Sequence, residues 1–214
     1  MSVKVKTCGM NSRASIAAAV KAGADYLGFV FHEPSPRHVS YCQAGELALG
    51  IPSHIAKVAL IVDAGDAQID EIIRVLDPDI LQAHGKESPE RIREITGRFK
   101  RPVWKAVAVR TAQDVAGARR YVQIAGKILF DAKAPETMPG ALPGGNALSF
   151  DWKLLSQSPI RDFVLAGGLT PQNVGEAVRL TCAPVVDASS SLESEPGIKD
   201  NGKIEAFIRS VKSL

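Results

Sequence analysis

The chain has 214 residues, of which 45% are hydrophobic, 23% are charged and 6% are aromatic. This length suffices for one sizeable core, and the composition is typical of a soluble globular protein. The net charge of +3 is mild, and scattered basic residues with few aromatic ones give little support to nucleic-acid binding.

The cysteines and the N-terminus bear on the cellular compartment. Three cysteines without CxxC spacing suggest neither a disulfide framework nor a zinc finger, so we expect a reducing, cytoplasmic environment. The apolar stretch 16–20 is interrupted at Lys21 and Asp25, well short of the length of a signal or membrane segment. We therefore expect an amphipathic helix there and no membrane association.

Short β-rich runs alternate with helix-length segments along the whole chain, and no low-complexity linker divides it. The sequence predicts strands over 3–7, 26–31, 56–62, 79–83, 102–107, 126–131, 161–165 and 184–187. It predicts helices over 12–22, 42–50, 67–76, 88–98, 112–121, 151–157, 171–180 and 201–212. Pro89 and Pro171 each follow a capping residue and are expected at the first helical position. We expect a single domain over residues 1–214.

Strands that each precede a helix predict parallel strands joined by right-handed crossovers. Eight such units in 214 residues approach the lower size limit of a closed (β/α)8 TIM barrel. The alternative, a doubly wound open sheet, usually carries a Gly-rich phosphate turn after its first strand. In this chain the glycine clusters follow the late strands, which favours the barrel.

Polar residues stand at the expected C-terminal ends of the strands, where barrel enzymes hold their chemistry. A thiol, carboxylates, a histidine and an arginine in such positions indicate a small-molecule active site. The residues at these strand ends and in the loops after them are Cys8, Arg37, Asp63, Gln82, His84, Asp131 and Asp187.

Two late loops predict a phosphate site. Gly167 and Gly168 precede a predicted helix, and unobstructed backbone amides near a helix N-terminus bind anions. Loops after strands 7 and 8 are the usual phosphate site of barrels, and the serines at 189–191 could add amides and hydroxyls. We therefore expect Gly167, Gly168, Ser189 and Ser190 to bind phosphate.

Arg37 follows Pro34-Ser35-Pro36, which stiffens the approach of its guanidinium and suits bidentate recognition of a substrate carboxylate. A metal site is an alternative use of nearby polar residues, since imidazole and carboxylate ligands can assemble from separate strands. No HxH or HExxH spacing supports it, and we predict no metal. The four residues that raise this alternative are His32, Asp63, His84 and Asp131.

Short motifs in a specific order identify a family. The chain resembles the phosphoribosylanthranilate isomerases of tryptophan biosynthesis over nearly its full length. The matching stretches are Lys6-Thr7-Cys8-Gly9, 23–31, Ser35-Pro36-Arg37, Gln82-Ala83-His84-Gly85, 130–133, Phe150-Asp151-Trp152, 165–174 and 187–200.

The resemblance implies an Amadori rearrangement without a cofactor. The furanose ring of N-(5'-phosphoribosyl)anthranilate opens to a Schiff base, loses its C2 proton and becomes 1-(2-carboxyphenylamino)-1-deoxyribulose 5-phosphate. By resemblance, Asp131 is the general acid and Cys8 the general base. The same resemblance implies that Arg37 binds the anthranilate carboxylate and that the late loops hold the phosphate. It also implies substrate contacts for Gln82, His84 and Asp187. The partner is thus a phosphosugar, and the oligomeric state, monomer or homodimer, stays open.

These roles place demands on two pKa values. A thiol of ordinary pKa is only a few per cent ionised at neutral pH, so a lower pKa would help Cys8 act as a base. A carboxyl group of ordinary pKa is about a thousandfold too ionised to act as an acid. We therefore expect burial or a neighbouring negative charge to raise the pKa of Asp131.

Some segments depart from the family pattern, and other functions stay open. Ser191 replaces a customary glycine, which raises the question of a strained positive φ, and Asn146-Ala147 replaces Thr-Gly. The loop over 133–149 is either a lid or a surface insertion. One alternative is a metal-dependent epimerase or an aldol-type lyase, for which only Lys105 or Lys133 offers a Schiff-base lysine. Another is a non-catalytic barrel that binds a phosphorylated metabolite.

Overall fold

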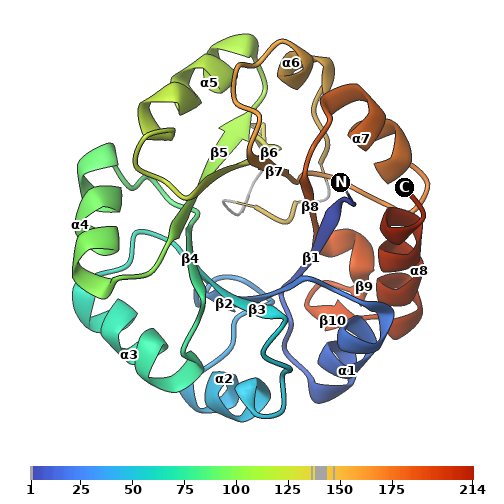
Figure 1. Cartoon of the computed structure of the whole chain (residues 1–214). Coiled ribbons are helices and arrows are strands. Elements are labelled where there is room, and N and C mark those ends of the chain that lie inside the picture. Colours follow the sequence, from blue (N-terminus) through green and yellow to red (C-terminus); the bar gives the residue numbers. More distant parts are fainter. Residues whose placement is uncertain (1, 136, 138–143, 147) are drawn as a thin grey trace.

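The computed structural model describes residues 2–135, 137, 144–146 and 148–214. Parallel strands β1 to β8 form a closed barrel in sequential order, with β8 pairing back onto β1. Figure 1 looks along the barrel, with the strands forming an inner ring and the helices an outer ring. The predicted (β/α)8 barrel is confirmed, and the open-sheet alternative is wrong.

The strands begin and end within two residues of the predicted bounds. They are β1 (Lys4–Cys8), β2 (Tyr26–Phe31), β3 (Ala56–Ile61), β4 (Ile80–Ala83), β5 (Val103–Val109), β6 (Lys127–Ala132), β7 (Phe163–Leu165) and β8 (Val185–Ala188). The helices are α1 (Arg13–Ala22), α2 (Tyr41–Ala48), α3 (Asp66–Leu76), α4 (Pro89–Phe99), α5 (Ala112–Gly117), α6 (Lys153–Ser156), α7 (Val174–Thr181) and α8 (Asn201–Lys212). A 3-10 turn, Ala118–Tyr121, completes the segment predicted as one helix over 112–121.

The two prolines behave differently from each other. Pro89 is the first residue of α4, and the Ser88 side chain caps that helix, as predicted. The prediction for Pro171 is wrong, because α7 begins only at Val174. The Asn173 side chain closes a turn ahead of the helix by accepting from the Thr170 amide at 2.8 Å and donating to the Gly168 carbonyl at 2.9 Å.

Alternate strand residues fill two separate cores. One face of the strands packs against the helices in the larger core, which includes Leu27, Ala59 and Leu81. The residues one step away point into the barrel, since side chains alternate across a strand. Strands β2 to β8 supply this inner cluster, which is Tyr26, Val58, Ile80, Trp104, Ala106, Leu129, Val164, Ala166 and Val185. The barrel interior is therefore packed and forms an apolar base beneath its C-terminal end.

A small hairpin between β8 and α8 was not predicted. Its strands β9 (Glu193–Glu195) and β10 (Ile198–Lys199) are antiparallel and lie outside the barrel beside α1 and α8 (Figure 1). Gly197 turns the chain with φ +84°, and a Cβ at this position would collide with the Pro36 carbonyl. The hairpin is thus packed directly against the loop that carries Arg37.

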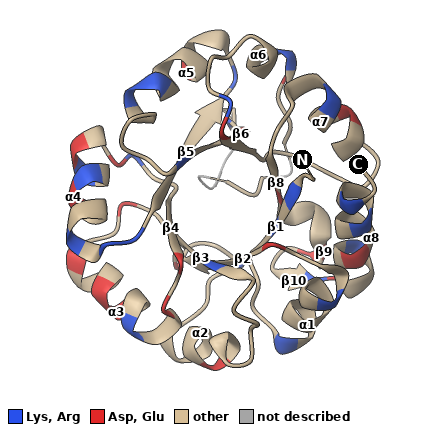
Figure 2. Ribbon diagram, in the orientation of Figure 1, with Lys and Arg blue, Asp and Glu red and all other residues tan. Residues whose placement is uncertain are grey.

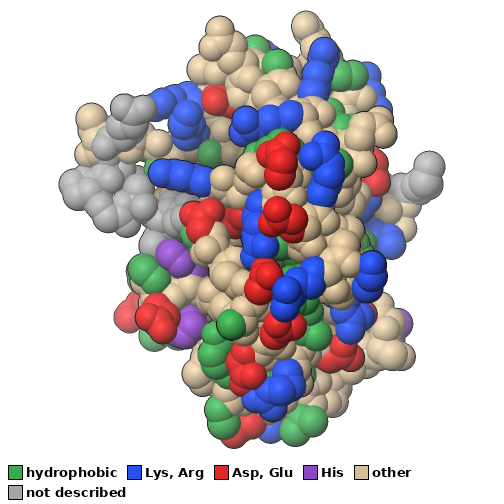
Figure 3. Space-filling model, turned by 90° about the vertical axis from the view of Figure 1, so that its left-hand side faces the viewer, with side chains coloured by type: hydrophobic (Ala, Val, Ile, Leu, Met, Phe, Trp, Pro, Cys, Tyr) green, Lys and Arg blue, Asp and Glu red, His purple; other side chains and the backbone are tan. Residues whose placement is uncertain are grey.

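Charges of both signs are spread over the outer helices (Figure 2). On the face drawn in Figure 3, basic and acidic side chains are interspersed, which agrees with the mild net charge. In the part of the chain that the structure describes, no helix combines the length and the apolar character that crossing a membrane requires.

Candidate active site

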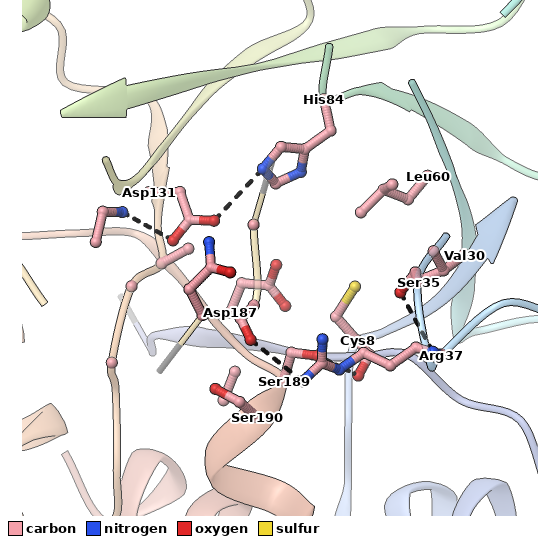
Figure 4. A pocket seen from close by; sticks show the side chains of 18 of the residues that line it. Cys8, Val30, Ser35, Arg37, Leu60, His84, Asp131, Asp187, Ser189 and Ser190 are labelled. Carbon is pink, nitrogen blue, oxygen red and sulfur yellow. Dashed lines mark hydrogen bonds and ion pairs between the residues drawn. The ribbon is translucent and has the colours of Figure 1, made fainter. Parts of the chain in front are cut away.

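A cavity of about 780 Å³, including its open mouth, lies at the C-terminal ends of the strands (Figure 4). Its lining comes from β1, β2, β3, β4, β6 and β8 and from loops at the same end of the barrel, including the loop after β7. Every residue to which the sequence assigned a catalytic or binding role lines this cavity, namely Cys8, Arg37, Gln82, His84, Asp131, Gly167, Gly168, Asp187, Ser189 and Ser190.

Cys8 and Asp131 face the cavity from opposite sides (Figure 4). Cys8 is the last residue of β1 and Asp131 the second-last residue of β6. Both are largely buried, with 5% and 8% of their surface exposed. A small molecule seated between them would have a thiol on one side and a carboxyl group on the other.

The Asp131 carboxyl group is held by its neighbours. Its Oδ1 accepts from the Ala132 amide at 2.8 Å, and its Oδ2 lies 3.4 Å from His84 Nε2. Gln82 Nε2 lies 3.0 Å from the other ring nitrogen of His84. A Cβ at Gly144 would come within 2.7 Å of both Asp131 Oδ2 and His84 Nε2. The residue chain Gln82–His84–Asp131 therefore fixes the orientation of the carboxyl group.

Arg37 is anchored by a residue that sequence reasoning gave no role. Its Nε and Nη2 donate to the two carboxylate oxygens of Glu193 at 2.7 and 2.8 Å, and Nη2 also donates to the Gly145 carbonyl. The two-pronged edge of the guanidinium is thus occupied, contrary to the expected bidentate grip on a substrate. Among the described residues Nη1 has no hydrogen-bond partner, and it is the donor left for a ligand carboxylate.

Glu193 joins the Arg37 loop to the loop after β8. Lys199 donates to Glu193 Oε1 at 2.7 Å and to the Ser189 carbonyl at 2.9 Å. Burial alone would raise the pKa of Glu193, but Arg37 and Lys199 outweigh it and hold the pKa below its ordinary value. Glu193 lies in the matching stretch 187–200, but that motif does not show its pairing with Arg37, which lies far away in sequence.

The predicted phosphate loops have the backbone that their glycines require. Gly167 and Gly168 have φ +84° and +65°, and a Cβ at Gly168 would lie 2.9 Å from the Leu148 carbonyl. Ser191, by contrast, is not among the residues with positive φ. It belongs to a 3-10 turn (Ser190–Leu192), and its hydroxyl donates to the Leu169 carbonyl at 2.5 Å. The replacement of glycine therefore adds a bond between the two loops rather than strain.

Beneath the cavity lies an ion pair that the sequence did not reveal. Lys6 Nζ lies 2.7 Å from Asp187 Oδ2, with 0% and 7% of the two side chains exposed. Lysines that alternate with Val5 and Thr7 are typical of a half-buried strand, but the polar face of β1 points into the closed barrel. Burial lowers the pKa of Lys6, yet Asp187 and Cys8 outweigh this and raise it, so the ammonium stays charged.

Two buried oxygen atoms at the cavity lack partners among the described residues: Asp187 Oδ1 and Gln82 Oε1. Leaving a buried acceptor without a hydrogen bond costs about 1–3 kcal/mol. Both residues line the cavity, so both atoms suit the hydroxyl groups of a bound ligand.

Other polar strand ends do not join the site. The Asp63 carboxylate accepts from the Lys86 amide at 2.6 Å, and Lys105 pairs with Glu87 at 2.9 Å. Lys133 lies 3.7 Å from Asp114. None of these lysines is in the described lining, which gives no support to a Schiff-base lyase. Over the described residues, no group of three or more His, Cys, Asp or Glu could hold a metal ion.

The loop over 133–149 can be followed only in part. Residues 136, 138–143 and 147 lie outside the described residues, so the choice between a lid and a surface insertion stays open, and the geometry of Ala147 lies outside them too. The described residues Gly144, Gly145, Asn146 and Leu148 line the cavity. This part of the loop therefore belongs to the site wall.

Comparisons with known proteins point to one family. A family model described as N-(5'phosphoribosyl)anthranilate (PRA) isomerase matches residues 5–210. An N-(5'-phosphoribosyl)anthranilate isomerase of Parvibaculum lavamentivorans is 50% identical over 99% of both chains. The crystal structure of the Thermotoga maritima enzyme is 34% identical, with a TM-score of 0.88 over 99% of this chain and 100% of that one. A phosphoribosyl anthranilate isomerase in complex with reduced 1-(o-carboxyphenylamino)-1-deoxyribulose 5-phosphate is 32% identical, with a TM-score of 0.85 over the same shares.

Proposed function

The chain belongs to the N-(5'-phosphoribosyl)anthranilate isomerase family, and from this premise we propose how its own residues carry out the reaction. The activity is the isomerisation of N-(5'-phosphoribosyl)anthranilate, an enzymatic step of tryptophan biosynthesis. The observation that carries the proposed mechanism is the placement of Cys8 and Asp131 on opposite sides of one cavity, between Arg37 and the two glycine-rich and serine-rich loops.

The substrate is a phosphosugar with an anion at each end, and the cavity has a matching arrangement. Arg37 Nη1 takes the anthranilate carboxylate, and the backbone of Gly167, Gly168 and Ser190 takes the phosphate. Asp187 Oδ1 and Gln82 Oε1 accept from ribose hydroxyls, which supplies the hydrogen bonds that these buried atoms lack. Binding at both ends holds C1 and C2 between the thiol and the carboxyl group.

Two proton transfers then complete the rearrangement. Asp131, protonated, gives its proton to the ring oxygen as the C1–O bond breaks, and the nitrogen lone pair forms the C1=N bond. The Cys8 thiolate removes the C2 proton, and the C2–H electrons form an enolamine as the iminium is neutralised. The enolamine tautomerises to the ketone. His84, beside Asp131, orients the acid.

The acid–base groups imply a pH dependence. Burial raises the pKa of the Cys8 thiol above its ordinary value, and Asp187 adds to this, while Lys6 and Lys199 oppose it. A lower pKa would have helped Cys8 act as a base at neutral pH, and the surroundings of the thiol do not supply it. The base is therefore mostly protonated in the free enzyme at neutral pH, and we expect kcat/KM to increase toward alkaline pH.

The test follows the fluorescence of the anthranilate-bearing substrate with purified protein and no added metal. Turnover should appear as a loss of this substrate fluorescence. We expect Cys8→Ala and Asp131→Asn each to lower kcat by about 10²–10⁴-fold. Cys42→Ser, at an exposed thiol away from the cavity, is the matched control and should behave as wild type. Turnover at the wild-type rate in both catalytic variants would reject the assigned roles, and activity lost to a chelator would favour the metal-dependent alternative.

We propose a single catalytic domain over residues 1–214 in the cytoplasm. All three cysteines are free thiols, which supports a reducing compartment.

A further inference from the structure

Lys6 and Cys8 share the inner face of β1. Residues two apart on a strand point to the same side, so the Lys6 ammonium and the Cys8 thiol both face the barrel interior. The lysine is fully buried and is absent from the cavity lining, whereas the cysteine lines it. Lys6 therefore lies behind the thiol rather than in contact with a bound substrate.

The neighbouring strand leaves room for these two groups to approach each other. Gly28 on β2 is the register partner of Cys8. A Cβ at Gly28 would lie 2.7 Å from the Cys8 sulfur and 3.1 Å from Lys6 Nζ. Any larger residue would push the sulfur or the ammonium away, so the missing side chain at this position allows both atoms to sit over β2 together.

The Lys6 ammonium is not saturated by oxygen partners. Among the described residues its one oxygen partner is Asp187 Oδ2, although an ammonium group has three donors. A buried ion pair is costly unless further hydrogen bonds satisfy its groups. The sulfur and the ammonium approach each other over Gly28, and a sulfur that carries a negative charge could accept from the remaining donors of Lys6.

We propose that Lys6 is a positioning residue whose buried ammonium is the counter-charge of the Cys8 thiolate, with Asp187 holding that ammonium in place. The proposal rests on the general-base role of Cys8. The charged groups that face the thiol are Lys6 from its own strand, Asp187 from β8 and Lys199 from β10. Of the two cations, Lys6 has the larger influence in lowering the pKa of Cys8, against the effect of burial.

The experiment measures the thiol directly. In a Cys42→Ser, Cys182→Ser background, Cys8 is the one remaining thiol, and its alkylation rate by iodoacetamide is followed against pH. Lys6→Met should move the midpoint to higher pH by about one to three pH units, and the acid limb of kcat/KM should move with it. Lys4→Met is the matched control, since it removes a lysine from the same face of β1 and should leave both profiles in place.

A second measurement covers the possibility that Lys6→Met does not fold. In the otherwise wild-type protein, the NMR signal of the Lys6 side chain should show a step at the pH where Cys8 titrates, and Cys8→Ser should remove the step. The proposal would be overturned if the pH profiles of Cys8 alkylation coincided in the Lys6→Met and Lys4→Met variants. It would also be overturned if the NMR signal of Lys6 did not change as Cys8 titrates. The alkylation and NMR readouts do not use the substrate, so failure of the isomerase assay alone would count against the proposed mechanism and not against this pairing.

Discussion

Lys6 and Lys105 each lie buried beside a carboxylate, at 2.7 Å from Asp187 and 2.9 Å from Glu87. Lys105 also donates to the carbonyls of Ala83 and Gly85. In this second pair every polar group has its partner, as expected of a structural element.

The carboxylates differ in the same way. Glu87 accepts from the amides of Asp63 and Gly85, whereas Asp187 keeps one buried oxygen without a partner. The pair at the cavity is thus incomplete until a ligand is bound, and the pair away from it is complete in the free protein. Incomplete hydrogen bonding, rather than burial or charge, separates the functional pair from the structural one.

The largest expected effect is on stability and concerns the complete pair. Lys105→Met leaves Glu87 charged and buried without its partner, so the free energy of unfolding should fall by about 3–5 kcal/mol. Urea unfolding measures this change. At a temperature where the variant is folded, kcat should stay within the same order of magnitude, and a loss as severe as that of Cys8→Ala would erase the distinction between the pairs.

The next effect is on turnover and concerns the incomplete pair. Asp187→Asn and Glu87→Gln both remove a buried carboxylate, and both should destabilise the protein. Only Asp187→Asn removes the acceptor that faces the cavity, so kcat/KM should fall about 100-fold in that variant alone. Steady-state kinetics well below the unfolding temperature provide the comparison, and equal losses in the two variants would contradict it.

The next effect is a pH dependence of stability and concerns the cluster of Arg37, Glu193 and Lys199. The stability that this cluster contributes should decrease in acid. The pKa of Glu193 is lower in the folded protein than its ordinary value. Its contribution to the free energy of unfolding is therefore fully present above the unfolded pKa of about 4.3 and is lost as pH falls through the folded pKa. Glu193→Gln should therefore cost about 1–3 kcal/mol at neutral pH and progressively less below pH 4 or so. Urea unfolding at a series of pH values tests this sign; a difference that grows in acid would refute it.

The smallest effect concerns the bond between the two phosphate loops. Ser191→Gly removes the hydrogen bond to the Leu169 carbonyl and frees the backbone, so KM should rise by about 2- to 5-fold. Ser191→Ala separates the two causes, because it removes the bond and keeps a Cβ. An unchanged KM in both variants would show that the loops do not depend on this bond.

Much of the barrel was predictable because its signals are local. The alternation of apolar and polar residues predicted the strands, and Ser88-Pro89 predicted the start of α4. Gly167-Gly168 predicted a loop, in which both glycines have positive φ. The ten predicted site residues line the cavity because strand ends meet at one rim of a closed barrel.

What the sequence did not reveal depends on contacts between distant segments. Alternation cannot distinguish a lysine that faces solvent from one that faces the interior of a barrel, so Lys6 was missed. The stretch around Glu193 does not indicate its role, since its partner Arg37 is 156 positions away. The strands of the β9–β10 hairpin are too short for the two-residue alternation of a strand to be recognised in the sequence.

The contacts that assemble the site cross the junction where the barrel closes. Lys6 meets Asp187, and the Ser189 hydroxyl meets the Cys8 carbonyl, each across 181 positions of sequence. Those bonds join the first strand to the last and have high contact order, so they form only once the chain has returned to its start. Regain of activity during refolding therefore reports ring closure itself, and should lag behind the recovery of helical circular dichroism.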